Sequence, residues 1–162
     1  MGIEGSPTMM VVRPYHSTMR TRVFALLESA GLRTAGAQRV EPGTPDDDAL
    51  AAIVEARPDV LLIPFHAHRD QAGNRLDGLT LSGRLHLLPD APQAPILMPI
   101  TPMASASLRL MTSSGERAEL YGELLGRRIL LLPEDEVDEA GTIPRVMAFL
   151  RRHGVRLGGG GR

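Results

Sequence analysis

Two histidines and an aspartate alternate directly after a strongly apolar run. His66, His68 and Asp70 follow residues 59–65. Alternate residues of an extended segment project to the same side, and imidazole nitrogens and carboxylate oxygens are ordinary zinc ligands. His16 follows another apolar run and would lie beside them if the two runs form adjacent strands. These four residues are therefore a candidate zinc site, although His66 and His68 are also explained as solvated loop residues.

The order His-x-His-x-Asp at residues 66–70 resembles the metal-binding motif of metallo-β-lactamase-like hydrolases. The likeness implies a metal-dependent hydrolase as an alternative function. It covers this loop alone. Gln71 stands where that family has its next histidine, and 162 residues are few for that fold.

Basic residues that follow the same two apolar runs form a second candidate site. Arg13 and His16 follow the first apolar run, and His66 and Arg69 lie in the histidine loop. Together with the free backbone amides of a helix expected from Ser17, these groups can bind a small anionic ligand. Arg13 and Arg69 are also explained as ordinary surface cations.

Composition removes several other chemistries. All 18 basic residues are arginine and there is no cysteine, which excludes disulfides, thiolate zinc sites, cysteine nucleophiles and lysine-based catalysis. A net charge of −1 and 3% aromatic residues give no reason to expect a nucleic acid partner. No run has the length of a membrane helix and no signal peptide pattern is present, so we expect no membrane association and a cytoplasmic location.

Alternating strands and helices must position these residues. Apolar runs at 9–12, 59–65, 95–100 and 129–132 are typical of buried strands, and a weaker run at 32–40 predicts an edge strand. The predicted helices cover residues 17–30, 44–57, 79–88, 116–127 and 142–153. This alternation predicts a three-layer α/β/α fold with a five-stranded parallel sheet and functional groups at the carboxyl ends of its strands.

Two of these helices have specific start signals. Thr44 is expected to cap the second helix, with Pro45 at the first helical position. The acidic residues 46–48 then face the positive end of the helix dipole, so we interpret them as a helix start and not as a metal site. Thr142 and Pro144 predict the start of the last helix in the same way.

The order of elements over roughly residues 9–153 resembles the receiver domain of response regulators. Four short sequence segments carry the resemblance: PDVLL at 58–62, LDGL at 76–79, APILM at 94–98 and LPE at 132–134. The resemblance implies a flavodoxin-like topology and a role in bacterial signal transduction through protein–protein interaction.

The groups on which receiver chemistry depends are replaced. Arg13 and Pro14 stand where that family has the carboxylates that hold magnesium, Pro64 where it has the phosphorylated aspartate, and Leu132 where it has a lysine. Thr101 matches the family's hydroxyl after a one-residue shift, and it joins the candidate ligand-binding residues. The resemblance therefore implies an atypical receiver that is not phosphorylated and has no catalytic residue.

Two segments, 64–77 and 102–115, are longer than the corresponding receiver turns. Both emerge at the carboxyl edge or the adjoining helix face, where we expect a protein partner or a second copy of the chain to bind. The candidate contact residues are Gln71, Asn74, Arg75 and Tyr121.

The expected domain covers residues 9–154. An N-terminal extension, 1–8, precedes it, and a flexible glycine-rich tail, 155–162, follows it.

Overall fold

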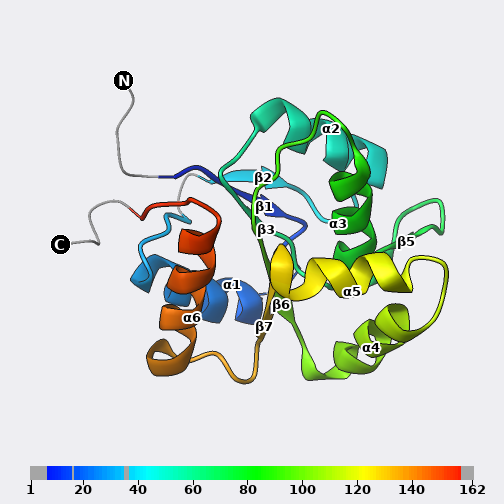
Figure 1. The fold of residues 1–162 in the computed structure, drawn as a ribbon. Coiled ribbons are helices and arrows are strands. Elements are labelled where there is room, and N and C mark those ends of the chain that lie inside the picture. Colours follow the sequence, from blue (N-terminus) through cyan, green and yellow to red (C-terminus); the bar gives the residue numbers. More distant parts are fainter. Residues whose placement is uncertain (1–6, 16, 35–36, 158–162) are drawn as a thin grey trace.

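A five-stranded parallel sheet lies between two layers of helices in the computed structural model (Figure 1). The structure describes residues 7–15, 17–34 and 37–157. The strands of the sheet are β1 (Met9–Val12), β2 (Gln38–Val40), β3 (Val60–Leu62), β6 (Ile96–Ile100) and β7 (Ile129–Pro133). Their order, β2-β1-β3-β6-β7 with all neighbours parallel, confirms the predicted fold class.

The helices are α1 (Ser17–Ser29), α2 (Asp46–Ala56), α3 (Gly78–Leu87), α4 (Ser105–Ser113), α5 (Ala118–Arg127) and α6 (Glu139–Arg152). A 3₁₀ turn, η1 (Pro102–Ala104), leads into α4. A small antiparallel hairpin pairs β4 (His68–Arg69) with β5 (Arg75–Leu76). It lies between β3 and α3 in the chain and stands apart from the main sheet (Figure 1).

Strand residues alternate between two separate core clusters, as the two-residue period of a strand requires. Leu61 and Ile63 pack with residues of α2, α3 and α5 on one face of the sheet. Val60 and Leu62 pack with residues of α1 and α6 on the other face. Both faces of β3 are therefore buried, as its continuous apolar sequence predicts.

The ladder between β3 and β6 is interrupted by a proline. Ile63 N donates to Leu97 O and Phe65 N to Pro99 O, both at 2.9 Å. Because Pro99 has no amide hydrogen to donate back, the ladder loses a bond there. Strand β3 therefore ends at Leu62, although the predicted apolar run continues to residue 65.

Both predicted helix caps are wrong. Helix α2 begins after Pro45, which makes no side-chain capping bond, and the Thr44 carbonyl accepts hydrogen bonds from Arg13. Helix α6 begins three residues earlier than predicted, at Glu139, because Asp138 accepts a hydrogen bond from Gly141 N at 2.6 Å.

The two residues of the predicted start signal of α6 have different roles. Thr142 returns the capping bond by accepting from Asp138 N at 3.2 Å. Pro144 lies inside the helix and not at its first position.

Three segments differ in extent from the sequence prediction. The edge strand is limited to β2, within the predicted run 32–40. The segment 102–115, expected as a connection longer than the corresponding receiver turn, contains η1 and α4. Val155 and Leu157, assigned above to a flexible tail, pack against the α1/α6 cluster.

At the N-terminus, Thr8 is part of the fold because its carbonyl accepts hydrogen bonds from Asp59 N and Val60 N. Residues 1–6 and 158–162 of the predicted extension and tail lie outside the described residues. Within the described ranges, no helix is both long enough and apolar enough to cross a bilayer.

Replacing Leu62 with Ala tests the central position of β3. Leu62 has no exposed surface and pairs with Val11 and Leu97, so the change should lower the free energy of unfolding by roughly 2–5 kcal/mol through lost burial and a cavity. Leu87→Ala is the matched control. Leu87 is 55% exposed, and we expect a loss of less than about 1 kcal/mol. Equal losses in urea unfolding would contradict the topology.

Candidate functional site at the carboxyl edge of the sheet

Arg13, directly after β1, is buried at 4% exposure. Its backbone adopts a left-handed φ of 56°. Nε and Nη2 donate to the Thr44 carbonyl at 3.0 and 2.6 Å, and Nη2 also pairs with Asp46 Oδ1 at 2.7 Å. This placement differs from the predicted ligand-binding role, because most of the guanidinium is used within the protein. Nη1 alone is buried without a hydrogen-bond partner in the described part of the chain.

Asp46 connects Arg13 to a second arginine. Arg84 Nη1, on α3, lies 3.4 Å from Asp46 Oδ2, and its Nη2 lies 2.6 Å from Asp47 Oδ1. The hydrogen bond to Asp47 is the main cause of a raised Arg84 pKa, and burial opposes it. The acidic start of α2 is therefore joined both to the end of β1 and to α3.

Tyr15, His66 and His68 form a stack. The ring centroids of Tyr15 and His66 are 4.4 Å apart with planes inclined by 14°, and those of His66 and His68 are 5.0 Å apart at 19°. Ring nitrogens bind a metal through lone pairs in the ring plane, so two imidazoles stacked face to face do not aim at one ion. Both nitrogens of His68 are buried, and no described residue is hydrogen-bonded to them.

The zinc prediction is not supported by the described members of its ligand set. No group of three His, Cys, Asp or Glu residues suited to a metal is found among the described residues. Asp70 has a structural partner instead, since its Oδ1 accepts from Asn74 N at 2.8 Å. The remaining predicted ligand, His16, which was also a predicted anion-binding residue, lies outside the described residues.

Asp70 closes the turn of the β4–β5 hairpin. Asp70 N donates to Asn74 O at 2.9 Å, and Arg69 Nη1 donates to Gly73 O, also at 2.9 Å. Gln71 and Asn74 are exposed near the tip of the hairpin. The hairpin is thus an ordered projection and not an open loop.

The LDGL segment, residues 76–79, connects the hairpin to α3 and has a structural role there. Asp77 caps the helix, accepting from Thr80 N at 2.7 Å, and it also pairs with Arg75 Nε at 3.1 Å. A Cβ atom at Gly78 would lie 2.1 Å from the Pro64 carbonyl oxygen, so only glycine fits. These two residues fix the start of α3 against the end of β3.

Tyr121, predicted as a partner contact, is placed differently. It is only 6% exposed and belongs to the core on the α2/α3/α5 side of the sheet. Its ring fills the space beside Gly83, where a Cβ would lie 2.8 Å from Tyr121 Cε1. The aromatic ring therefore joins α5 to α3 and is not available at the surface.

A cavity of about 400 Å³ opens at the carboxyl edge. Tyr15, His66 and Thr101 contribute polar groups to its wall, and Met103 and Ser107 also line it. Thr101, a predicted ligand-binding residue, lines the same cavity as Tyr15 and His66, because the three residues follow the neighbouring strands β6, β1 and β3. Arg69 is exposed on the hairpin and is absent from the lining of this cavity.

Glu134, directly after β7, was not among the predicted site residues. It is 6% exposed, its backbone N donates to Ile100 O at 2.9 Å, and burial raises the pKa of its carboxyl group. Its position in the sequence could have identified it, because a charged residue directly after a buried parallel strand lies at the carboxyl edge of the sheet. Glu134 can accept hydrogen bonds there.

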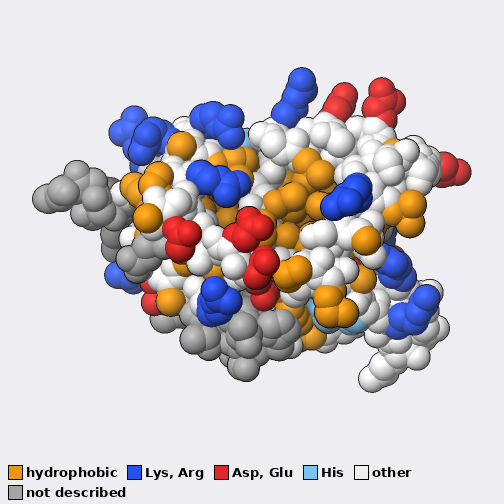
Figure 2. Space-filling view, turned by 90° about the horizontal axis from the view of Figure 1, so that it is seen from below, with side chains coloured by type: hydrophobic (Ala, Val, Ile, Leu, Met, Phe, Trp, Pro, Cys, Tyr) orange, Lys and Arg blue, Asp and Glu red, His pale blue; other side chains and the backbone are white. Residues whose placement is uncertain are grey.

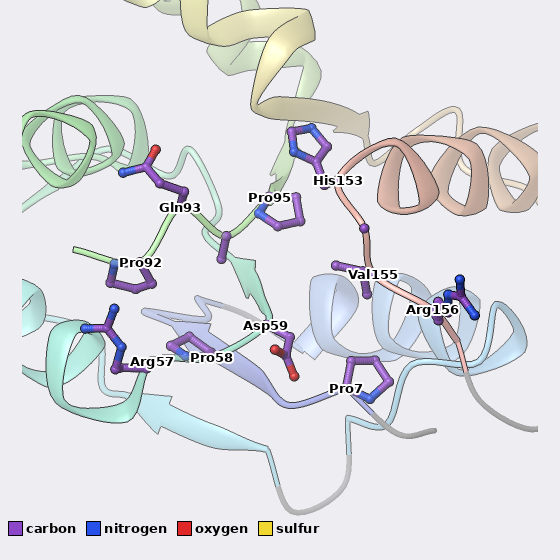
Figure 3. Close-up of a pocket in the computed structure, with 12 residues that line it drawn as sticks. Pro7, Arg57, Pro58, Asp59, Pro92, Gln93, Pro95, His153, Val155 and Arg156 are labelled. Carbon is purple, nitrogen blue, oxygen red and sulfur yellow. The ribbon is translucent and has the colours of Figure 1, made fainter. Parts of the chain in front are cut away.

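A second cavity, of about 660 Å³, lies at the opposite, amino edge (Figure 3). Arg57 and Arg156 lie on opposite sides of this cavity, with Asp59 between them (Figure 3). Asp59 Oδ2 accepts from Thr8 N at 2.8 Å and from Thr8 Oγ1 at 3.1 Å. Because the charged side chains do not converge, we regard the carboxyl edge as the candidate functional site.

Comparison with protein-family models and with curated protein sequences finds no match. Solved structures do match. A candidate response regulator from Chloroflexus aurantiacus is 20% identical, with a TM-score of 0.53, over 91% of this chain and 100% of that one. The chain has the fold of a receiver domain.

Two further structures agree on this fold. The signal receiver domain of the candidate response regulator NarL from Mycobacterium tuberculosis is 15% identical, with a TM-score of 0.52, over 91% of this chain and 98% of that one. A sensor protein from Polaromonas sp. JS666 is 11% identical, with a TM-score of 0.56, over 90% and 97%. In this receiver fold, Arg13, Pro64, Thr101 and Glu134 follow β1, β3, β6 and β7.

Removing Asp46 tests how far the site depends on its ion pair. Asp46→Ala should lower the free energy of unfolding by roughly 3 kcal/mol, because it leaves the Arg13 charge buried without its carboxylate. Asp48→Ala is the control, since Asp48 is exposed in the same first turn of α2 and should cost less than about 1 kcal/mol through the helix dipole. Urea unfolding of both variants gives the difference, and similar losses would show that the pair contributes little.

Proposed function

We propose that the chain is a receiver-like regulatory module of bacterial signal transduction that acts by binding a protein partner and is not phosphorylated on aspartate. The observation that carries this proposal is the Arg13–Asp46 ion pair at the end of β1. Magnesium requires oxygen ligands, and a buried guanidinium at this place repels a divalent cation. Regulation then depends on a partner or a ligand and not on an acyl phosphate. The proposal assigns no catalytic residue.

The ends of β3 and β7 support the same proposal. Pro64 follows β3 at the position that the receiver resemblance gives to the phosphorylated aspartate, and a prolyl ring has no carboxylate to phosphorylate. Leu132, at the position of the family's lysine, has no exposed surface and packs in the α1/α6 cluster. Neither residue can take part in phosphoryl transfer.

The carboxylates nearest the hairpin already have structural roles. Asp70 holds the hairpin turn, and Asp77 is 2% exposed as the cap of α3. A phosphoryl group on either would break these bonds, so neither is a ready substitute for the missing aspartate.

A second candidate function is the binding of a small ligand in the cavity of about 400 Å³. Tyr15 and His66 follow β1 and β3, between which the strand order of the sheet reverses. Open α/β sheets bind ligands at such a point. Such a ligand would also contact Thr101, and it would regulate the module without a chemical reaction. The metal-dependent hydrolase has no comparable support.

Treatment with acetyl phosphate and magnesium tests the absence of phosphorylation. We expect no base-labile, hydroxylamine-sensitive phosphoryl adduct by mass spectrometry of the intact chain, because Pro64 and Leu132 provide neither acceptor nor lysine. A receiver domain with the complete set of groups, treated in parallel, verifies the reagent. An adduct on Asp70 or Asp77 that hydroxylamine removes would refute the proposal.

A further inference from the structure

Methionine sulfur is the group in this chain that an oxidant attacks most readily. The sequence contains no cysteine and no tryptophan, but it contains 8 methionines. A peroxide converts a thioether to a sulfoxide, and for this the oxidant must reach the sulfur atom. The burial of each methionine therefore decides which of them reacts first.

Met103, in η1, is 92% exposed. The other methionines whose side chains are described are buried in the two core clusters or half-buried against them: Met9, Met10, Met98, Met111 and Met147. An oxidant in solution reaches Met103 in the native state, whereas a buried sulfur is reached only when the structure opens locally or globally. The fold thus singles out Met103 among these residues.

Met103 also lines the cavity of about 400 Å³ at the carboxyl edge. Thr101 and Ser107 contribute hydroxyl groups to the same cavity, and hydroxyl groups can donate hydrogen bonds to a sulfoxide oxygen. Oxidation therefore replaces an apolar part of this wall with a polar acceptor. Because Met103 is exposed, the change removes no core contact and should cost little stability.

Charges of both signs lie on this side of the molecule. Helix α4, which follows η1, lies along the lower edge of the molecule in Figure 1, and Figure 2 shows the molecule from below. Apolar side chains gather near the centre of this face, with acidic and basic side chains beside them (Figure 2). These surroundings select no charged reactant, but a small neutral oxidant such as hydrogen peroxide needs no electrostatic attraction.

We propose that Met103 is a modification site for two-electron oxidation by a peroxide, and that its sulfoxide makes the wall of the carboxyl-edge cavity polar while the fold persists. The sulfur lone pair attacks one peroxide oxygen, so an S–O bond forms and the O–O bond breaks. Sulfur is oxidised and the peroxide is reduced. The proton of the transferred oxygen joins the leaving hydroxide to give water. Sulfoxide reductases can reverse this modification. The inference goes beyond the proposed function, because it holds for any partner or ligand at this edge.

Graded treatment of the full chain with hydrogen peroxide tests the choice of residue. Peptide mapping by mass spectrometry reports each methionine separately, so Met1 and Met19, which lie outside the described side chains, do not enter the comparison. We expect Met103 to be oxidised at least about tenfold faster than Met98 in the folded chain, and both to react at similar rates in urea. Equal rates in the folded chain, a difference that persists in urea, or faster oxidation of Met111 or Met147 overturns the inference.

Nuclear magnetic resonance of the chain, treated just long enough to oxidise Met103, tests the effect on the cavity. His66 and Ala67 are distant from Met103 in sequence but line the same cavity, so their amide signals should shift if the sulfoxide lies in its wall. Met103→Leu should abolish these shifts, because leucine has no sulfur. Met147→Leu, on α6 and outside this cavity, should keep them. The urea midpoint of the oxidised chain should equal that of the untreated chain. Unchanged His66 and Ala67 signals, shifts that persist in M103L, or a lowered midpoint overturns the inference.

Discussion

The buried guanidinium of Arg13 is the constraint on which the carboxyl edge depends. A buried cation is costly unless it is paired and hydrogen-bonded, so the start of α2 must bring the Thr44 carbonyl and the Asp46 carboxylate to it. Asp46 also pairs with Arg84, which ties α3 to the same point. Two helices that follow different strands, α2 and α3, are thereby fixed relative to β1. The same contacts place positive charge where a magnesium site would need oxygen ligands, so the architecture of this edge and its proposed lack of phosphorylation have one cause.

The fold was predictable because its signals are local. Apolar runs at the successive strands, separated by amphipathic segments, are sufficient for a parallel sheet covered on both faces. The helix caps were not predictable in the same way. Thr44 has a suitable side chain for a cap, but Arg13, distant in sequence, uses its carbonyl. At α6, both Asp138 and Thr142 fit a cap, and the reciprocal bonds between them place the start at the aspartate.

The location of the candidate site could be predicted from the sequence, but the side chains that form it and their orientations were harder to predict. Residues after neighbouring parallel strands must meet at one edge, which is why Tyr15, His66 and Thr101 line one cavity. The His-x-His spacing could not reveal ring orientation, because Tyr15, from another strand, sets the stack. Glu134 was missed because a single glutamate after a strand is usually solvated. Its burial depends on packing that one sequence does not display.

The segments that distinguish this chain from the receiver pattern contribute little to its core. No residue of α4 is fully buried, and within the β4–β5 hairpin only Leu76 belongs to the core. The two large clusters on the faces of the sheet are built mainly from the other strands and helices. Because surface substitutions cost little stability, side chains such as Arg69, Ser107 and Leu110 can change without endangering the fold. Substitutions at Arg13 or Asp46, in contrast, break a buried ion pair and lower the stability of the fold.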